Sequence, residues 1–298
     1  MIILRHLTKQ FGSRLAVENL SMEVRRGDVF GLLGHNGAGK STTIGMLLGQ
    51  VWPDSGEALI DGKNVIRDRA GALARVGAIF EAPAFYEELS GRRNLEILSA
   101  YTAPTSKERI REVIGWVSLS GRENQAVRTY SHGMRARLAL AQALLPDPEL
   151  LILDEPTNGL DPEGIHEMRT TIRRLHGELG LTLMLSSHLL TEVEQLCNRI
   201  AVLNGGRKVF DGTLTEAKHH QDWVRLQTED FDRAATLLTA EGLVTASQQG
   251  CRVALAQGIP VSQVVQRLVE LGFPVHAVYP EEQTLEGFYL SLMKERRE

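Results

Sequence analysis

Residues 34–41 read Gly34-His35-Asn36-Gly37-Ala38-Gly39-Lys40-Ser41, which fits the phosphate-binding pattern G-x-x-x-x-G-K-[ST]. The run from Val29 to Leu33 directly before it predicts a buried strand, and Ser41 to Leu48 predicts a helix directly after it. In this setting the glycines let backbone N–H groups turn inward around phosphate oxygens, and the helix N-terminus adds partial positive charge. Lys40 would reach the β and γ phosphates, and the Ser41 hydroxyl would bind Mg²⁺.

A second apolar strand, Leu150 to Leu153, ends in two adjacent acids, Asp154 and Glu155. Acids at the end of a buried strand are costly unless something there uses them. Asp154 suits the ligand shell of Mg²⁺, and Glu155 could polarise the water that attacks a γ-phosphate. Alone, the pair could be a strand-capping Asp and a solvated Glu. The phosphate loop favours the catalytic interpretation.

The composition is that of an ordinary globular protein of about two domains, since a domain averages roughly 150 residues. The 298 residues are 43% hydrophobic and 23% charged. No apolar run approaches the ~18 residues that cross a bilayer, and the N-terminus shows no secretory signal. We therefore expect a cytosolic location. Cys197 and Cys251 stand far apart without metal-ligand spacing, so we expect neither a disulfide framework nor a zinc site.

The sequence changes in character after Phe210-Asp211-Gly212-Thr213, which predicts domains at 1–212 and 213–298. The first part alternates apolar runs with helical patterns, as α/β units with a mostly parallel sheet do. The second predicts the order β-α-β-β-α-β of a small ferredoxin-like α+β domain and a helical tail. Its expected elements are strands 224–228, 243–246, 251–255 and 275–279 and helices 231–240, 261–271 and 284–295.

Charge separates the same two parts. The first 212 residues hold 25 basic and 25 acidic residues, and residues 213–298 hold 8 basic and 12 acidic ones. Proteins that bind nucleic acids usually carry a basic stripe, so we expect no nucleic-acid partner.

The run from Leu150 to Pro162, LLILDEPTNGLDP, together with the phosphate loop resembles the ATP-binding cassette (ABC) family, the ATPase subunits of ABC transporters. The resemblance covers roughly residues 1–212 and implies an α/β P-loop core with a helical subdomain. It implies ATP and Mg²⁺ as ligands, with Ser41 and Asp154 at the metal, Glu155 as catalytic base, and the phosphates held by Gly34, Asn36, Gly37, Ala38, Gly39, Lys40, Ser41 and Thr42.

The segment Tyr130-Ser131-His132-Gly133-Met134 resembles the family signature L-S-G-G-Q and departs from it at three of five positions. Ser131 can cap a helix from Met134 to Leu145, whose N-terminal N–H groups would bind a γ-phosphate. Because this chain already holds phosphate at its own loop, the family implies a head-to-tail homodimer, or a pair of ATPase subunits. Ser131 and Gly133 would then contact the partner's ATP.

Three further positions match the family pattern, and a fourth departs from it. His188 corresponds to the switch histidine that contacts the γ-phosphate, Phe11 to the aromatic that stacks on adenine, and Asp161 to the loop that contacts the partner. Glu81 stands where the family normally carries a Gln that links Mg²⁺ to the membrane partner. Phe11 could instead be a core residue, and Glu81 a solvated loop residue.

The resemblance implies a cytosolic ATPase subunit, peripheral on the cytoplasmic face of the membrane, that drives a separate integral-membrane permease. One cassette with a small second domain is most similar to the ATPases of ABC-2 type exporters. The permease would dock between Glu81 and Tyr130, where Pro83-Ala84-Phe85-Tyr86 offers aromatic anchors. Two alternatives stay open: a soluble ABC ATPase acting on ribosomes or DNA, and a ligand-sensing second domain.

Overall fold

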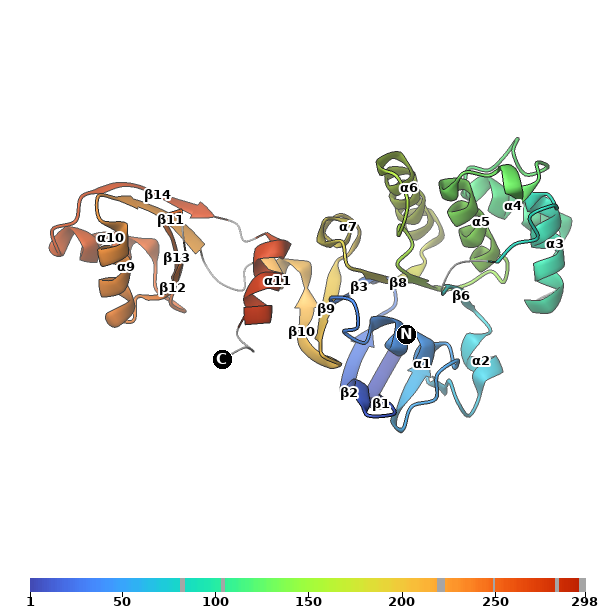
Figure 1. The fold of residues 1–298 in the computed structure, drawn as a ribbon, viewed down its shortest axis with the longest axis horizontal. Helices are drawn as coiled ribbons and strands as arrows, with labels where there is room; N and C mark the ends of the chain where they lie inside the picture. The colour runs from blue at the N-terminus through green and yellow to red at the C-terminus, as the bar shows by residue number, and fades with distance from the viewer. Residues whose placement is uncertain (81–83, 103–104, 219–222, 249, 282–283, 295–298) are drawn as a thin grey trace. The chain divides into compact units, whose positions relative to one another are not determined.

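The computed structural model describes residues 1–80, 84–102, 105–218, 223–248, 250–281 and 284–294 (Figure 1). The chain divides into two compact units, Met1–Gly212 and Thr213–Glu298. Across the described ranges, every helix is too short or too polar to cross a membrane.

The first unit begins with an antiparallel sheet. Its strands are β1 (Ile2–Phe11), β2 (Arg14–Val24), β4 (Ser55–Ile60) and β5 (Lys63–Asn64). They lie in the order β2-β1-β4-β5, and β1 pairs in antiparallel fashion with both β2 and β4. One face of this sheet contributes Ile2, Leu4 and Leu7 to the core.

A six-stranded sheet forms the centre of the first unit. Its strands are β3 (Val29–Leu33), β6 (Val76–Ile79), β7 (Leu150–Asp154), β8 (Thr182–Ser187), β9 (Arg199–Asn204) and β10 (Arg207–Thr213). Their order is β10-β9-β3-β8-β7-β6, and β3 pairs in parallel with β8 and β9, as β7 does with β6 and β8. Ligands bind outside the carboxyl ends of such strands. The loop after β3 and the ends of β7 and β8 share that edge.

Three helices of the first unit contact one another and form a group. The helices of this unit are α1 (Lys40–Leu47), α2 (Arg69–Leu73), α3 (Gly91–Thr102), α4 (Lys107–Trp116), the 3₁₀ turn η1 (Val127–Thr129), α5 (His132–Leu144), α6 (Pro162–Leu179) and α7 (Leu190–Leu196). Helices α3, α4 and α5 contact one another and lie together at one side of the unit in Figure 1. They form the expected helical subdomain, which confirms that part of the predicted fold.

The core of the first unit surrounds α1, which contacts strands of both sheets, β2, β4 and β7. Phe30, Ile44 and Ile152 have no exposed surface and belong to one buried cluster. Fully burying a side chain of this size stabilises a fold by about 1.5–3 kcal/mol. Helix α1 is therefore fixed firmly, and with it the loop from which it begins.

The second unit has the predicted β-α-β-β-α-β order. Its elements are β11 (Trp223–Thr228), α9 (Phe231–Ala240), β12 (Val244–Gln248), β13 (Arg252–Leu255), α10 (Val261–Glu270) and β14 (Val275–Glu281), flanked by α8 (Leu214–Lys218) and α11 (Leu285–Lys294). The strands lie in the order β12-β13-β11-β14, and neighbours pair in antiparallel fashion. The ferredoxin-like prediction is confirmed, although β12 begins at Val244 rather than Leu243, and β13 at Arg252 rather than Cys251.

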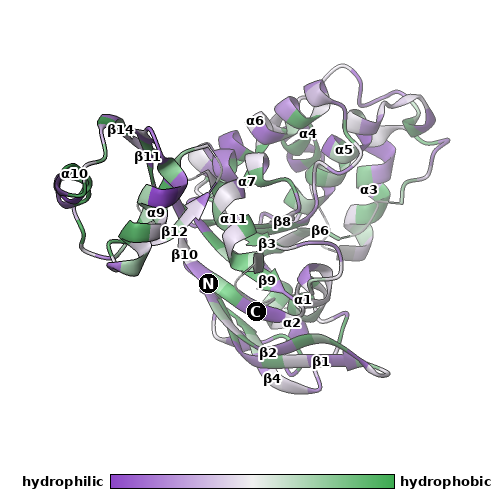
Figure 2. Ribbon diagram, turned by 60° about the vertical axis from the view of Figure 1, so that its left-hand side comes forward, coloured by the Kyte–Doolittle hydropathy of each residue, from purple (hydrophilic) through white to green (hydrophobic). Residues whose placement is uncertain are grey.

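Both helices between these strands are amphipathic. Figure 2 shows both hydrophilic and hydrophobic residues on α9 and on α10. Ala234 and Leu238 of α9 and Val264 and Leu268 of α10 are buried in a core with Val253, separate from the core of the first unit. Each unit therefore has its own hydrophobic centre.

Deleting residues 213–298 is expected to leave a folded first unit. The buried residues of its central core all lie between Ile2 and Leu203, so the deletion removes none of them. Domains with their own core fold alone in principle. Circular dichroism of residues 1–212 should show helix and strand content and a cooperative thermal transition. A spectrum of unfolded chain, or melting without a transition, would refute the independence of the two units.

Candidate active site

The predicted phosphate loop lies between β3 and α1, and its last glycine shapes the start of that helix. Gly39 is the N-cap residue with φ 107°, in the left-handed region. A Cβ at this position would lie 2.6 Å from the carbonyl oxygen of Ala16. Position 39 therefore requires glycine. The helix begins at Lys40, one residue earlier than the sequence predicts.

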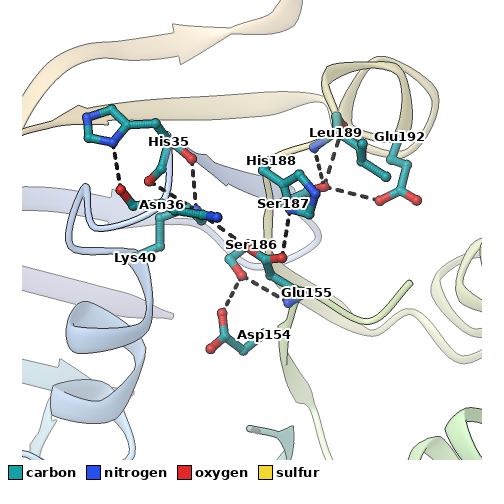
Figure 3. A network of polar contacts seen from close by, with 11 residues as sticks. His35, Asn36, Lys40, Asp154, Glu155, Ser186, Ser187, His188, Leu189 and Glu192 are labelled. Atoms are coloured by element: carbon teal, nitrogen blue, oxygen red, sulfur yellow. Dashed lines mark hydrogen bonds and ion pairs between the residues drawn. The ribbon is translucent and has the colours of Figure 1, made fainter. Parts of the chain in front are cut away.

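Lys40 is buried beneath the loop, with 5% of its surface exposed. Its Nζ donates to the carbonyl oxygen of Gly34 at 2.8 Å and lies 3.4 Å from Glu155 Oε1 (Figure 3). An unpaired buried cation is very costly, so the carboxylate stabilises this lysine in place. The pair also joins the end of β7 to the phosphate loop.

Glu155 follows β7 with φ 47°, a left-handed backbone conformation that few residues other than glycine adopt. Its N–H lies 3.0 Å from Ser186 Oγ and 3.2 Å from the Ser186 carbonyl oxygen. Its Oε2 lies 2.7 Å from His188 Nδ1 (Figure 3). A carboxylate only accepts hydrogen bonds, so Nδ1 is the donor in this contact, and Glu155 does not contact Nε2.

Asp154, the last residue of β7, accepts a hydrogen bond from the Ser186 hydroxyl at its Oδ1. The two residues face each other because Asp154 pairs with Ser186 in the β7–β8 register. One hydroxyl therefore contacts both the Asp154 side chain and the Glu155 backbone, which fixes the two acids relative to each other.

Two cavities meet at this site. One, of about 580 Å³, is lined by Phe11, Arg14, Ala16, Asn36, Gly37, Gly39, Lys40, Ser41, Thr42 and Glu155. The other, of about 640 Å³, is lined by Ser41, Ile79, His132, Arg135, Ala136, Ala139, Asp154, Glu155, Pro156, Asn158 and Gly159. Ser41 and Glu155 line both, so they lie where the cavities adjoin.

The signature segment, Tyr130–Met134, leads into α5. Ser131 is the N-cap, and its Oγ accepts from the backbone N–H of Met134 at 3.2 Å. The capping prediction is confirmed, although the helix begins at His132 rather than Met134 and ends at Leu144 rather than Leu145. The His132 ring approaches Gly159: a Cβ there would lie 3.3 Å from His132 Nε2.

Asp161 caps α6 in the same manner, since its Oδ1 accepts from the backbone N–H of Gly164 at 2.9 Å. A Cβ at Gly133 would lie 3.8 Å from the Cα of Gly164. The N-termini of α5 and α6 are therefore neighbours, and both carry partial positive charge.

Charge and burial also shape the surroundings of the signature segment. Burial, and after it the charge of Glu123, raise the pKa of the Tyr130 phenol, which donates to the carbonyl oxygen of Arg122 at 2.9 Å. A hydrogen bond from Arg135 at 2.6 Å lowers the pKa of Glu87. Arg135, which lines the larger cavity, is thus held by an acid.

The structure brings most of the predicted site residues together. Phe11, half exposed rather than in the core, lines the smaller cavity with the phosphate-loop residues. His188 joins the site through Glu155, whereas Ser131, Gly133 and Asp161 line neither cavity. Their contact with nucleotide stays a prediction. Glu81 and Pro83 lie outside the described residues.

Sequence reasoning missed three contributors. Arg14 lines the smaller cavity and donates to the Gly37 carbonyl oxygen at 3.3 Å. Ser186 contacts Asp154 and Glu155, and Glu192 contacts Thr157, two residues after Glu155, and Ser187, directly before His188. Only Ser186 had a sequence signal, because it lies two residues before His188 on a buried strand.

Comparison with known proteins gives consistent matches. The family described as "ABC transporter" matches residues 17–158. YhcH of Bacillus subtilis (strain 168), an uncharacterized ABC transporter ATP-binding protein, is 40% identical and covers 99% of this chain and 96% of its own. The Nod factor export ATP-binding protein I of Ralstonia nicotianae is 37% identical and covers 78% and 74%. A solved structure of an "ATP binding subunit of ABC transporter" has a TM-score of 0.65 and 28% identity, and covers 74% and 92%.

Proposed function

Because this chain belongs to the family of ABC transporter ATP-binding proteins, we propose that it supplies the energy of ATP hydrolysis to a transporter that exports its substrate. The chain is an ATPase subunit that binds ATP. Export is supported by the similarity of this chain to a protein named for Nod factor export. It is also supported by the arrangement of one cassette followed by a small second domain, which resembles the ATPases of ABC-2 type exporters. The observation that carries the proposal is the meeting of Lys40, Glu155 and His188 beside one phosphate loop.

Each of these residues has a role in the proposed reaction. Lys40 binds the β- and γ-phosphate oxygens, and Glu155 accepts the proton of the attacking water. His188 turns Nε2 toward the γ-phosphate, because its Nδ1 is held by Glu155, and it donates a hydrogen bond to a phosphate oxygen when Nε2 also carries a proton. Phe11 stacks on the adenine at the mouth of the smaller cavity. The αL backbone of Glu155 is strain of the kind that accumulates at functional sites.

The donor set at this site fits Mg²⁺. Ser41 and Asp154 line the same cavity and offer hard oxygen ligands, which this cation prefers. In the described part of the chain, no group of three His, Cys, Asp or Glu side chains could hold a metal by itself. Phosphate oxygens would complete the shell, with Glu81 as the further ligand that the family resemblance implies. Bound there, the cation neutralises charge on the phosphates.

Two copies of the chain are proposed to close on two ATP molecules. The N-termini of α5 and α6, capped by Ser131 and Asp161, offer backbone N–H groups outside this chain's own phosphate loop. In a head-to-tail pair, Ser131 and Gly133 bind the γ-phosphate held by the partner, and Asp161 contacts the partner's loop. His132 against Gly159 brings the two segments of one chain together at this surface.

The membrane partner is proposed to be an integral-membrane permease, which would place this subunit on the cytoplasmic face. Tyr86 supports this docking surface because the residue is 53% exposed and lies shortly before α3, in the helical subdomain of the first unit. Large exposed aromatics are frequent anchors of protein interfaces. Residues 213–298 are proposed to act as an accessory domain, and the match to YhcH includes them.

The docking proposal predicts a change in membrane association. In cells of the source organism, Tyr86→Ala should lower the fraction of the chain that sediments with membranes severalfold, because an aromatic anchor is lost. Trp52→Ala is the matched control, since Trp52 is 68% exposed and follows α1 rather than preceding α3. Equal sedimentation of wild type and both variants would contradict the docking surface. A wild-type chain that never sediments would favour an ATPase acting without a permease.

A further inference from the structure

Glu192, on α7, is a carboxylate buried beside the site, with 4% of its surface exposed. Its Oε2 accepts hydrogen bonds from Thr157 Oγ1 at 2.7 Å and from Ser187 Oγ at 3.1 Å. Both hydroxyl residues are themselves buried, at 4% and 3% exposed. A buried carboxylate is costly unless it is well hydrogen-bonded. These two hydrogen bonds therefore offset part of the free-energy cost of burying Glu192.

Both oxygens of the Glu192 carboxylate lie in the protein interior. Its Oε1 is buried and, among the described residues, has no hydrogen-bond partner. Burial, and after it the charge of Glu192, raise the pKa of the Cys197 thiol one turn along the chain. Since hydrogen bonds are stronger where water is excluded, the two bonds at Oε2 hold their partners firmly.

The two partners belong to the two segments that carry the proposed reaction. Thr157 lies two residues after Glu155, and Ser187 directly precedes His188. Figure 3 shows Glu192 contacting Ser187, the residue before His188, whose ring contacts Glu155. One carboxylate oxygen thus joins the turn after β7 to the end of β8, the two segments that carry Glu155 and His188, whose side chains lie 2.7 Å apart.

We propose that Glu192 is a positioning residue, which holds Glu155 and His188 at the separation that ATP hydrolysis requires. This inference rests on the proposed function of the site. Glu155 needs such support because its φ of 47° is an unfavourable conformation that the surrounding contacts must impose. Within the turn, the N–H of Asn158 donates to the Glu155 carbonyl oxygen at 3.0 Å, so a displacement of Thr157 would be passed to Glu155.

Glu192→Ala in the full chain is expected to lower kcat by about 10- to 100-fold, the scale on which small misplacements of reacting groups act. The KM for ATP should stay within about twofold, because the phosphate loop binds the nucleotide and does not contact Glu192. Glu192→Gln keeps an acceptor oxygen of the same reach, so it should retain kcat within about threefold of wild type.

Val193→Ala is the matched control, because Val193 is the next residue on α7, has no exposed surface and packs toward Gly31 instead of the two hydroxyls. It should lower the melting temperature and leave kcat near wild type. A wild-type kcat in Glu192→Ala, an equal loss in Val193→Ala, or an equal loss in Glu192→Gln would each overturn the proposal.

A readout without ATP separates this inference from the proposed function. Ring nitrogen chemical shifts of His188, assigned by comparison with a His188→Gln chain, report the hydrogen bond at Nδ1. Glu192→Ala should move the Nδ1 resonance, and Val193→Ala should leave it in place. An unchanged Nδ1 shift in Glu192→Ala refutes the positioning role whether or not the chain hydrolyses ATP. Absence of phosphate release from the wild type refutes the proposed function alone.

Discussion

Lys40→Ala is expected to lower ATP hydrolysis by about 10³-fold or more, the scale of removing a preorganised charge-stabilising group from an active site. Lys40 is the lysine of the phosphate loop, and its Nζ lies 3.4 Å from Glu155 Oε1, beside the proposed phosphate position. A 10³-fold loss corresponds to about 4 kcal/mol of transition-state stabilisation. Phosphate release by the purified chain with ATP and Mg²⁺ measures it.

Lys40→Met is the companion variant, because it fills the buried space that Ala leaves and removes only the charge. Lys63→Ala is the control, since Lys63 lies on β5 and lines neither cavity. Both Lys40 variants should lose activity while Lys63→Ala keeps it. Turnover near wild type in Lys40→Met would remove Lys40 from the site.

Glu155→Gln should lower kcat by about 10² to 10⁴-fold, the range for removal of a general base, and should leave ATP binding intact. The amide oxygen can still accept from His188 Nδ1, so that contact is kept, while the base and the ion pair with Lys40 are lost. Unhydrolysed ATP should then hold two copies together. Light scattering with ATP and Mg²⁺ should give twice the mass measured without nucleotide.

Glu178→Gln provides the control for this second variant, because Glu178 is exposed near the C-terminal end of α6, away from its capped N-terminus and outside both cavities. It should hydrolyse ATP at the wild-type rate and show no stable ATP-bound dimer. If Glu155→Gln hydrolyses normally, Glu155 is not the base. If it stays monomeric with ATP bound, the proposed pairing of two copies is wrong.

The parts of the fold that were predictable are those in which local chemistry determines structure. The apolar run Val29 to Leu33 forms a buried strand at the predicted bounds, because the glycine-rich loop ends it sharply. In the second unit, α9 has its predicted bounds, capped by Asp230. Helix α5 was placed two residues late because Ser131 caps it directly, so the helix begins at the next residue.

The contacts that depend on strand pairing were not predictable. Ser186 reaches Asp154 because β7 and β8 are parallel neighbours in that register, and the sequence alone does not specify a register. Glu192 contacts Thr157 across 35 positions, since α7 folds back beside the turn after β7. Motifs identified the groups that would touch the nucleotide. The buried polar groups that hold them in place follow only from the tertiary structure.

Two copies of this chain are proposed to hydrolyse ATP together, so phosphate release per chain should depend on protein concentration. With saturating ATP and Mg²⁺, activity per chain should rise with protein concentration until light scattering shows dimers, and then level off. Lys40→Met should stay at background throughout. Activity per chain that is constant across the monomer range, or phosphate release no greater than that of Lys40→Met at any concentration, would contradict this proposal.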